Sequence, residues 1–335
     1  MPVSVAARNR CMNKASVSFH DLHPSADDLA ADVLAGLSRA QKSIPPKYFY
    51  DAEGSRLFDA ITELPEYYPT RTETAMLREY ADEIAKTAGT GHLLVEPGSG
   101  SCTKARILFE GLQPCAYVPM DISRDHLRVA AQAVAIDYPW LEVHAACTDF
   151  TRLMTLPPTS PEGRRLAFFP GSSIGNFDPD AAVSFLGMIA DMVGPGGQLL
   201  IGVDLKKDKA LLESAYDDAQ GVTAAFNLNL LARINRELGT DFDLAQWRHK
   251  ALYNEAQGRI EMHLVSRVAQ QVNLQGQTFR FAGGETIHTE NSYKYSVAEF
   301  RDLASRAGFA TDTVWVDADR LFSLHLLQTG NADED

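Results

Sequence analysis

The sequence predicts an α/β fold in which a mostly parallel β-sheet is covered by helices and carries a second, inserted α+β unit. Three observations favour this fold. Between about residues 90 and 205, apolar runs of strand length alternate with segments of helical periodicity, which is the pattern of βαβ units. Two closely spaced glycines follow the first of these runs, where a strand turns into a helix. Residues 206–290 break the alternation, first with helices and then with strands of alternating polarity, which indicates an inserted unit.

The strands of the parallel sheet are expected where the apolar runs are short, because a strand buried on both faces is apolar throughout. These runs occupy residues 93–96, 116–121, 142–146, 166–169 and 198–204. Between them, apolar residues spaced three and four apart predict helices at 126–136 and 181–192. A helix at 297–307, followed by a late hairpin of strands, is expected to complete the sheet with residues 311–316 and 321–327.

The second unit is expected to combine two distant segments of the chain. Residues 18–70 are helical and then rich in aromatic residues and prolines, while Phe226, Leu230 and Ile234 recur every four positions on one stripe of a helix. Residues 259–265 and 277–281 alternate as strands do. We therefore expect a substrate-binding domain of residues 18–70 plus 206–293, a sheet domain of residues 71–205 plus 294–328, a flexible tail at 1–17 and an acidic tail at 329–335. A cleft between the two domains is the expected ligand site.

Composition and charge exclude several classes of protein. Hydrophobic residues make up 45% of the 335 residues and charged residues 22%, which is typical of a globular chain. The net charge of −13 disfavours nucleic acid and anionic membrane surfaces as partners, and no apolar run reaches the ~18 residues of a membrane span. Four scattered cysteines without a CxxC pair indicate free thiols, so we expect a cytoplasmic protein. Nine histidines without an HxH or HxxxH pair predict no metal site.

Three successive strands end in residues suited to a nucleoside cofactor. The first leads into Gly98-Ser99-Gly100, with Lys104 in the following helix, and glycines at such a turn let backbone amides approach a ligand. Asp121 ends the second strand, where a carboxylate can bind both ribose hydroxyls. Asp149 and Phe150 end the third, where they can hold the amino group and the face of an adenine. Together these positions are typical of S-adenosylmethionine (SAM) methyltransferases. NAD enzymes share the first two, but no hydride-transfer arrangement stands out.

Six longer motifs carry a resemblance to one family. They are IPPKYFYDAEGSRLFDAITELPEYYPTR (44–71), VEPGSGSCTK (95–104), FFPGSSIGNF (168–177), AYDDAQGVTAAFN (215–227), RIEMHL (259–264) and GETIHTENSYKY (284–295). The sequence resembles the histidine Nα-methyltransferases of ergothioneine biosynthesis, and the resemblance runs in order from about residue 20 to 328. It implies a class I SAM-dependent methyltransferase fold, which is Rossmann-like, with an inserted α+β substrate-binding domain.

The resemblance also implies roles for individual residues. SAM, which leaves as S-adenosylhomocysteine, is expected to contact Gly98, Lys104, Asp121, Asp149 and Phe150. The expected catalytic positions are Gly171, whose carbonyl faces the substrate amine, and Tyr50, which orients that amine. Asn176 and Tyr216 are expected to hold the amino-acid carboxylate, and the imidazole pocket is expected to consist of Tyr67, Met262, Glu290 and Ser292. Taken singly, these residues also fit ordinary structural roles, such as a turn at Asn176 or strand packing at Met262.

The chemistry of the ring pocket favours histidine as the substrate. Glu290 accepts hydrogen bonds and Ser292 can donate or accept, so the pair can bind both nitrogens of an imidazole. An indole offers one donor and no acceptor, which leaves a buried carboxylate poorly matched. We therefore expect a monomeric enzyme that transfers methyl groups in line from SAM to the α-amine of L-histidine, up to the trimethylated betaine hercynine. The alternatives are a methyltransferase of another aromatic amino acid or amine such as tryptophan, and a SAM-binding module without catalysis.

Overall fold

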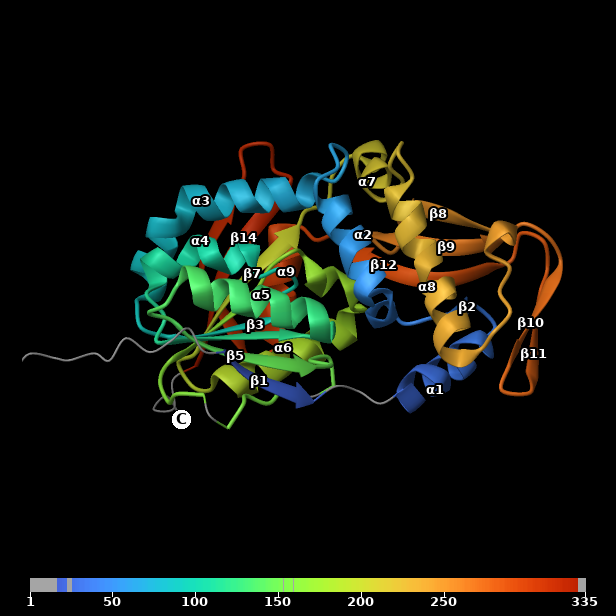
Figure 1. Cartoon of the computed structure of the whole chain (residues 1–335). Coiled ribbons are helices and arrows are strands. Elements are labelled where there is room, and N and C mark those ends of the chain that lie inside the picture. Colours follow the sequence, from blue (N-terminus) through green and yellow to red (C-terminus); the bar gives the residue numbers. More distant parts are fainter. Residues whose placement is uncertain (1–16, 23–25, 153, 159, 331–335) are drawn as a thin grey trace, which may run out of the picture.

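A computed structural model describes residues 17–330 except 23–25, 153 and 159, and its largest feature is an eight-stranded sheet (Figure 1). The strands are, in order across the sheet, β1 (Val17–Leu22), β5 (Glu142–Thr148), β4 (Ala116–Asp121), β3 (Leu93–Pro97), β6 (Arg165–Phe169), β7 (Gln198–Asp204), β14 (Phe322–Thr329) and β13 (Phe309–Val316). Every pairing is parallel except the two made by β14. β3 and β7 are buried at every position, as the apolar runs predict.

Helices cover both faces of this sheet. The helices on one face are α3 (Tyr68–Ala88), α4 (Thr103–Leu112) and α5 (Arg124–Asp137), and those on the other are α6 (Pro179–Val193) and α9 (Val297–Arg306). Leu94 and Leu200 pack in the first apolar layer, whereas Val95 and Ile201 pack in the second, because successive side chains of a strand point to opposite faces. The carboxyl ends of β3, β4 and β6 therefore lie at one edge of a sheet that is covered on both sides.

A second, smaller unit lies beside the large sheet (Figure 1). Its four-stranded sheet has the order β2 (Lys42–Ser43), β12 (Thr286–Tyr293), β9 (Arg259–Ser266) and β8 (Trp247–Asn254), and a separate hairpin consists of β10 (Gln270–Leu274) and β11 (Gln277–Phe281). The helices of this unit are α1 (Ala26–Leu37), η1 (Pro46–Phe49), α2 (Ala52–Thr62), α7 (Lys209–Tyr216), α8 (Val222–Leu238) and η3 (Leu244–Gln246). Phe49 and Tyr68 share one apolar core with Phe226, Leu230 and Ile260, so two distant parts of the chain depend on each other for burial.

After α3, the chain crosses between the two units at two adjacent points. It leaves the large sheet where β7 ends at Asp204, and it returns where β12 ends at Tyr293. Leu205 and Tyr295 form a bridge between these two crossings. The segment after β6 carries the short helix η2 (Ser173–Asn176), which lies against β12. Both crossings therefore place charged and polar residues next to the edge where the parallel strands end.

One part of the expected domain division differs in the structure. The sequence predicts residues from 18 onward in the substrate-binding domain, but β1 pairs in parallel with β5 at the edge of the large sheet, from Val17 opposite Val143 to Leu22 opposite Thr148. The strand signal was weak because an edge strand is only half buried, and Phe19 is the main apolar side chain that it adds to the core. Of the expected tails 1–17 and 329–335, residues 1–16 and 331–335 lie outside the described residues, whereas Val17 belongs to β1 and Thr329 to β14. Within the described part of the chain, none of the helices combines the length and apolarity that a membrane crossing requires.

Candidate active site

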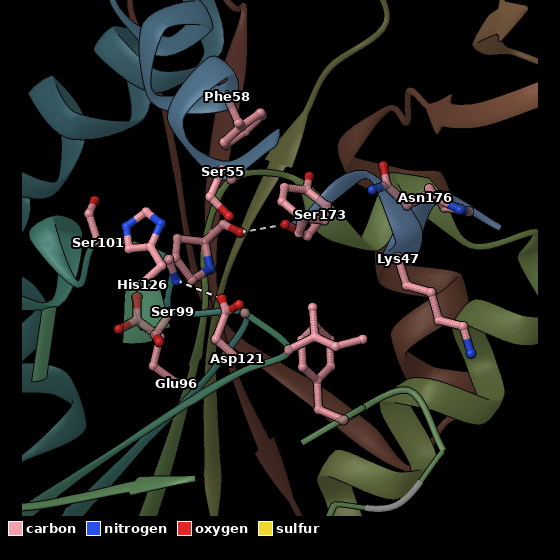
Figure 2. Close-up of a pocket in the computed structure, with 18 of the residues that line it drawn as sticks. Lys47, Ser55, Phe58, Glu96, Ser99, Ser101, Asp121, His126, Ser173 and Asn176 are labelled. Carbon is pink, nitrogen blue, oxygen red and sulfur yellow. Dashed lines mark hydrogen bonds between the residues drawn. The ribbon is translucent and has the colours of Figure 1, made fainter. Parts of the chain in front are cut away.

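A cavity of about 450 Å³ lies between the carboxyl edge of the large sheet and the second unit. The turn after β3 and the end of β4 form one side, the loop after β6 forms another, and the segment from η1 to α2 closes it. Figure 2 shows Ser99 and Asp121 facing this space from one side and Ser173 and Asn176 from the other, with Phe58 of α2 above. Ligands of open α/β sheets bind at such an edge, at the point where the strand order reverses. Here that point is β3, because β4 lies on one side of it and β6 on the other.

The turn after β3 brings backbone close to the cavity. Gly98 and Gly100 both have positive φ, of +70° and +49°, which glycine adopts without strain. The N–H groups of Gly98 and Ser99 donate to the carbonyl of Met120 at 2.7 and 3.0 Å, which ties the turn to β4. A Cβ atom on Gly98 would lie 3.3 Å from the ring of Phe150, so the glycine also makes room for that ring. Gly98 and Phe150, which are expected to contact the cofactor, both line the cavity.

Asp121 lies at the end of β4 and faces the same turn. Its carboxylate accepts hydrogen bonds from the N–H groups of Gly100 at 2.9 Å and Ser123 at 2.8 Å. Burial raises the pKa of Asp121 above its ordinary value, although these donors oppose the shift. The carboxylate is thus fixed in orientation and lines the cavity, as binding of a ribose diol requires.

Asp149 does not line the cavity directly but binds a lysine that does. Lys47 of η1 lies 3.1 Å from Asp149 and 3.1 Å from Asp32 of α1, so its ammonium joins the second unit to the end of β5. The N–H of Thr151 also donates to Asp149, at 3.1 Å. Sequence reasoning missed Lys47, because the partners of a lysine in a proline- and aromatic-rich segment cannot be read from local pattern.

Two further buried carboxyls beside the cavity were also missed. Glu73 of α3 has no exposed surface, and it accepts from Lys104 at 2.5 Å and from the N–H of Gly171 at 2.8 Å. A Cβ on Gly202 of β7 would lie 1.9 Å from Glu73, so the glycine creates the space for this carboxylate. Glu96 lines the cavity and accepts from the hydroxyl of Tyr117, and burial raises the pKa of Glu96 to about 8. Lys104 and Gly171 line the cavity, where the resemblance implies them, and the buried carboxylate of Glu73 binds both.

Tyr50, Tyr67 and Asn176 line the part of the cavity nearest the second unit. The ring of Tyr50 packs edge-on against Phe58 and Phe226, with centroids 5.8 and 5.9 Å apart. Burial raises the pKa of Tyr50 well above its ordinary value, and the nearby carboxylate of Glu290 adds to the shift. The phenol therefore stays protonated at neutral pH, which suits an orienting group and disfavours a phenolate base.

The remaining expected substrate residues lie behind this part of the cavity and do not line it. Glu290 and Ser292 are on β12, opposite Met262 and Ile260 of β9, and opposite residues of an antiparallel pair share one face of the sheet. Burial raises the pKa of Glu290 to about 7, and only Lys294 opposes the shift. The ring of Tyr216 at the end of α7 lies 6.1 Å from that of Tyr67, edge to face. These side chains adjoin the cavity residues Tyr50 and Tyr67, whose pKa values Glu290 also raises.

A buried hydrogen-bonded cluster holds Tyr216 and Ser292 in place. Their hydroxyls are 2.8 Å apart, and the ammonium of Lys294 donates to both, at 3.0 Å to Tyr216 and 2.8 Å to Ser292. Lys294 also lies 2.7 Å from Asp204, which accepts from the hydroxyl of Tyr68 and from Lys207 as well. Burial works against ionisation of Asp204, yet the two lysines hold its pKa below the ordinary value.

One group of residues outside the cavity has metal-ligating side chains. Glu261, His263 and His288 place possible ligand atoms within 4.8 Å of one another. Arg259 and Asn254 bind Glu261, however, and the two imidazoles stack at 4.7 Å with only 21° between their planes. Because an imidazole binds a metal in its own ring plane, stacked rings do not direct their lone pairs at one point. The arrangement is not a formed metal site, and the absence of a metal stays a prediction.

The fold and the cavity define the class of protein. This is a class I SAM-dependent methyltransferase: the sheet is mostly parallel with an antiparallel β14, a glycine turn follows β3, and an acid ends β4. Residues 29–329 match the family described as histidine-specific, SAM-dependent methyltransferases. The chain belongs to this family.

Individual relatives agree with the family match. The histidine N-alpha-methyltransferase of Mycolicibacterium smegmatis is 45% identical over 308 residues, which cover 90% of this chain and 95% of that protein. The enzyme of the same name from Mycobacterium tuberculosis is 43% identical over 304 residues, covering 89% and 94%. Ergothioneine biosynthesis protein 1 of Neurospora crassa is 32% identical over 85% of this chain, which spans 33% of that longer protein.

Proposed function

We propose that the protein transfers methyl groups from SAM to the α-amine of L-histidine and forms the trimethylated betaine hercynine, the first step of ergothioneine biosynthesis. The observation that carries this proposal is the course of the cavity. It runs from the glycine turn and Asp121 to Tyr50, Tyr67 and Asn176, next to the carboxyl of Glu290. Family membership and the two mycobacterial relatives support the same reaction.

In this proposal the large sheet binds SAM. Gly98 and Phe150 leave a narrow, partly aromatic surface for the adenosine, and Asp121 is oriented for the ribose hydroxyls. Asp149 is proposed to accept from the adenine amino group while it stays paired with Lys47, and Lys104 to bind the methionine carboxylate while it stays paired with Glu73. SAM supplies a methyl group on a positively charged sulfur, which is already a strong electrophile. The protein therefore needs mainly to orient the amine and keep it neutral.

The second unit, built from residues 26–70 and 206–293, is proposed to bind histidine. Asn176 and Tyr216 bind the carboxylate, the carbonyl of Gly171 accepts from the amine, and the hydroxyl of Tyr50 orients the amine directly or through water. The ring pocket consists of Tyr67, Met262, Glu290 and Ser292. Support comes from the position of Tyr50, Tyr67, Gly171 and Asn176 around one cavity and from the cluster that holds Tyr216 and Ser292 just behind it.

Tryptophan, the alternative substrate, fits the same pocket less well. An indole has a single N–H donor, so it leaves either Glu290 or Ser292 without a partner, and an unpaired buried polar group costs about 1–3 kcal/mol. Histidine can engage both groups. We further propose that the enzyme is monomeric and cytoplasmic. One chain supplies the whole cavity, and Cys102 and Cys115 are free thiols among the described residues, as in a reducing compartment.

The test is to incubate the purified protein with SAM and a mixture of the free amino acids, and to identify methylated products by mass spectrometry. We expect histidine with up to three methyl groups and no other methylated amino acid. The matched control is Asn176→Ala, which should bind SAM normally but methylate histidine poorly. Methylation of tryptophan instead would contradict the ring-pocket argument. SAM binding without any product would contradict the enzyme function itself and favour a non-catalytic SAM-binding module.

A further inference from the structure

Lys294 donates to both hydroxyls of the Tyr216–Ser292 pair at the proposed carboxylate site and has no assigned role. It follows β12 directly and is 1% exposed. Its ammonium has three hydrogens, and the structure provides three acceptors for them: Asp204 at 2.7 Å, Ser292 at 2.8 Å and Tyr216 at 3.0 Å. All of its donors are thus used, and two of them end on hydroxyls that the proposed function places against histidine.

A count of hydrogens shows what this does to the two hydroxyls. Tyr216 and Ser292 each have one hydrogen, and each accepts one from Lys294. The hydrogen bond between the two hydroxyls, at 2.8 Å, uses one of their two hydrogens. One hydrogen of the pair therefore remains for a ligand. If Tyr216 donates it to a carboxylate, Ser292 must donate to Tyr216 and has only a lone pair left for the ring of the ligand.

The charges of the cluster also favour binding of a carboxylate at Tyr216. Asp204 is ionised and faces two lysines, Lys294 and Lys207, so these three buried groups together carry one positive charge. The charge of Lys294 also lowers the pKa of Glu290, and in the proposed function Glu290 binds the imidazole. A ligand carboxylate on Tyr216 would approach the cluster from the cavity side and balance the remaining charge, which is worth more in a buried site than in water.

We propose that Lys294 is a positioning residue for carboxylate recognition: it holds the Tyr216–Ser292 pair so that a single hydroxyl hydrogen, on Tyr216, is offered to the substrate carboxylate, with a buried positive charge behind it. This inference rests on the proposed function. Ser292 then accepts from the imidazole, as Glu290 does. Lys294 itself touches neither substrate nor cofactor, and its effect passes through Tyr216.

The chain offers a matched control for this role. Lys207 is also buried and also pairs with Asp204, and it donates to Tyr68, but it contacts neither Tyr216 nor Ser292. Lys207→Met and Lys294→Met each leave Asp204 with one lysine and with the hydroxyl of Tyr68. The two variants therefore disturb the buried charges similarly, and they differ in whether the hydroxyl pair loses its ammonium donor.

The experiment compares the binding of L-histidine and of histamine, which lacks the carboxylate, to protein saturated with S-adenosylhomocysteine, by calorimetry. For Lys294→Met we expect histidine affinity to fall roughly ten- to a hundredfold, the range for loss of a charge-assisted hydrogen bond, while histamine affinity changes less than about threefold. Lys207→Met should not discriminate between the two ligands. Equal weakening of both ligands by Lys294→Met, or no weakening of histidine, would overturn the inference.

Steady-state kinetics supply a second, independent readout. We expect Lys294→Met to raise KM for histidine and to leave KM for SAM unchanged, whereas general damage to the fold would change both. If Lys294→Met does not fold, Lys294→Gln keeps neutral donors without the charge and should show a smaller loss that is still selective for histidine. The wild-type protein separates the two proposals: no methylation of histidine contradicts the proposed function, whereas a normal wild type with an unselective Lys294 variant contradicts only this inference.

Discussion

Glu290 is the residue whose ionisation the fold changes most usefully. It lies on β12 opposite Met262, and burial raises its pKa to about 7. A carboxyl that titrates near neutral pH can accept from an imidazolium when ionised and donate to a neutral imidazole when protonated. The same burial has a cost, because in the protein without ligand the ionised form lacks its usual hydration. That cost can be measured as a dependence of stability on pH.

The prediction for Glu290 concerns the free energy of unfolding between pH 5.5 and 8.5. A carboxyl whose pKa is raised in the folded state keeps its proton over a range in which the unfolded chain has lost it, so stability falls as pH rises from about 4.5 to about 7. Glu290→Gln removes this loss. We expect the variant to be more stable than the wild type by about 3 kcal/mol at pH 8, with a smaller difference at pH 5.5, as measured by urea unfolding without ligand.

The comparison with wild type isolates Glu290 from other groups. Glu96, whose pKa burial raises to about 8, produces a fall of the same sign in both proteins and cancels in the difference. If the free energies of unfolding of wild type and variant depend on pH in the same way, the pKa of Glu290 is the same in the folded and the unfolded state, contrary to the prediction. The carboxyl of Glu290 that is proposed to bind the imidazole is therefore also the group that lowers the stability of the ligand-free protein.

At the scale of elements, the contact between η2 and β12 positions Asn176. Gly175 precedes it in η2, and a Cβ there would lie 2.7 Å from the carbonyl oxygen and 3.1 Å from the nitrogen of Tyr293. Both are backbone atoms of a paired strand and cannot move away cheaply. The two elements therefore pack at a distance that only glycine permits, and this close packing sets where the neighbouring amide side chain lies.

We expect Gly175→Ala to push η2 away from β12 and to displace Asn176. KM for histidine should rise about tenfold or more, because small misplacements of a binding group have large effects, and stability should fall by about 1–3 kcal/mol. Gly187→Ala is the control: this glycine lies inside α6 with no atom near its Cβ position, so the change should stabilise by about 0.5–1 kcal/mol and leave KM unchanged. An unchanged KM in Gly175→Ala would refute the positioning role.

At the scale of the whole molecule, Lys47 links the two units across the cavity. It pairs with Asp32 of the second unit and with Asp149 at the end of β5. Without it, these two carboxylates face each other with Arg152 as the remaining nearby cation among the described residues, 3.6 Å from Asp32 and 3.7 Å from Asp149. The link thus contributes to closure of the second unit over the proposed cofactor site, and Arg152 limits the effect of losing it.

We expect Lys47→Met to weaken binding of S-adenosylhomocysteine roughly three- to tenfold, the scale of a partly buried ion pair. Amide hydrogen exchange in residues 45–58 should be faster than in the wild type, because the segment that closes the cavity opens more often. Lys42→Met is the matched control: its side chain is 15% exposed against 16% for Lys47, but its partner Glu285 belongs to the same unit. Equal effects of the two variants would mean that the ion pair across the cavity does not contribute to closure.

The sequence predicted the parts of the molecule whose signals are local. Apolar runs and the Gly98 turn were sufficient for the parallel strands and their cofactor edge, because each signal lies within a few residues. Glu73 could not be found this way, since an acid in a long helix normally faces solvent, and only the crossing of α3 over Gly202 buries it. Lys294 lies within the motif at 284–295, yet its burial depends on the point where the chain after β7 lies next to the chain after β12.

The second unit's shared core has a consequence for synthesis of the protein on the ribosome. Apolar residues of α1 and α2, such as Val33 and Ile61, share one core with residues of α8 and β9, which lie far downstream in the chain. At about 5–20 residues per second, the nascent chain reaches residue 212 on the order of ten seconds after residue 67. Until then the early helices lack the part of their core that α8 and β9 supply, while β3 to β7 emerge and can begin to pair. A nascent chain of this intermediate length should therefore be a good client for chaperones that bind exposed apolar segments.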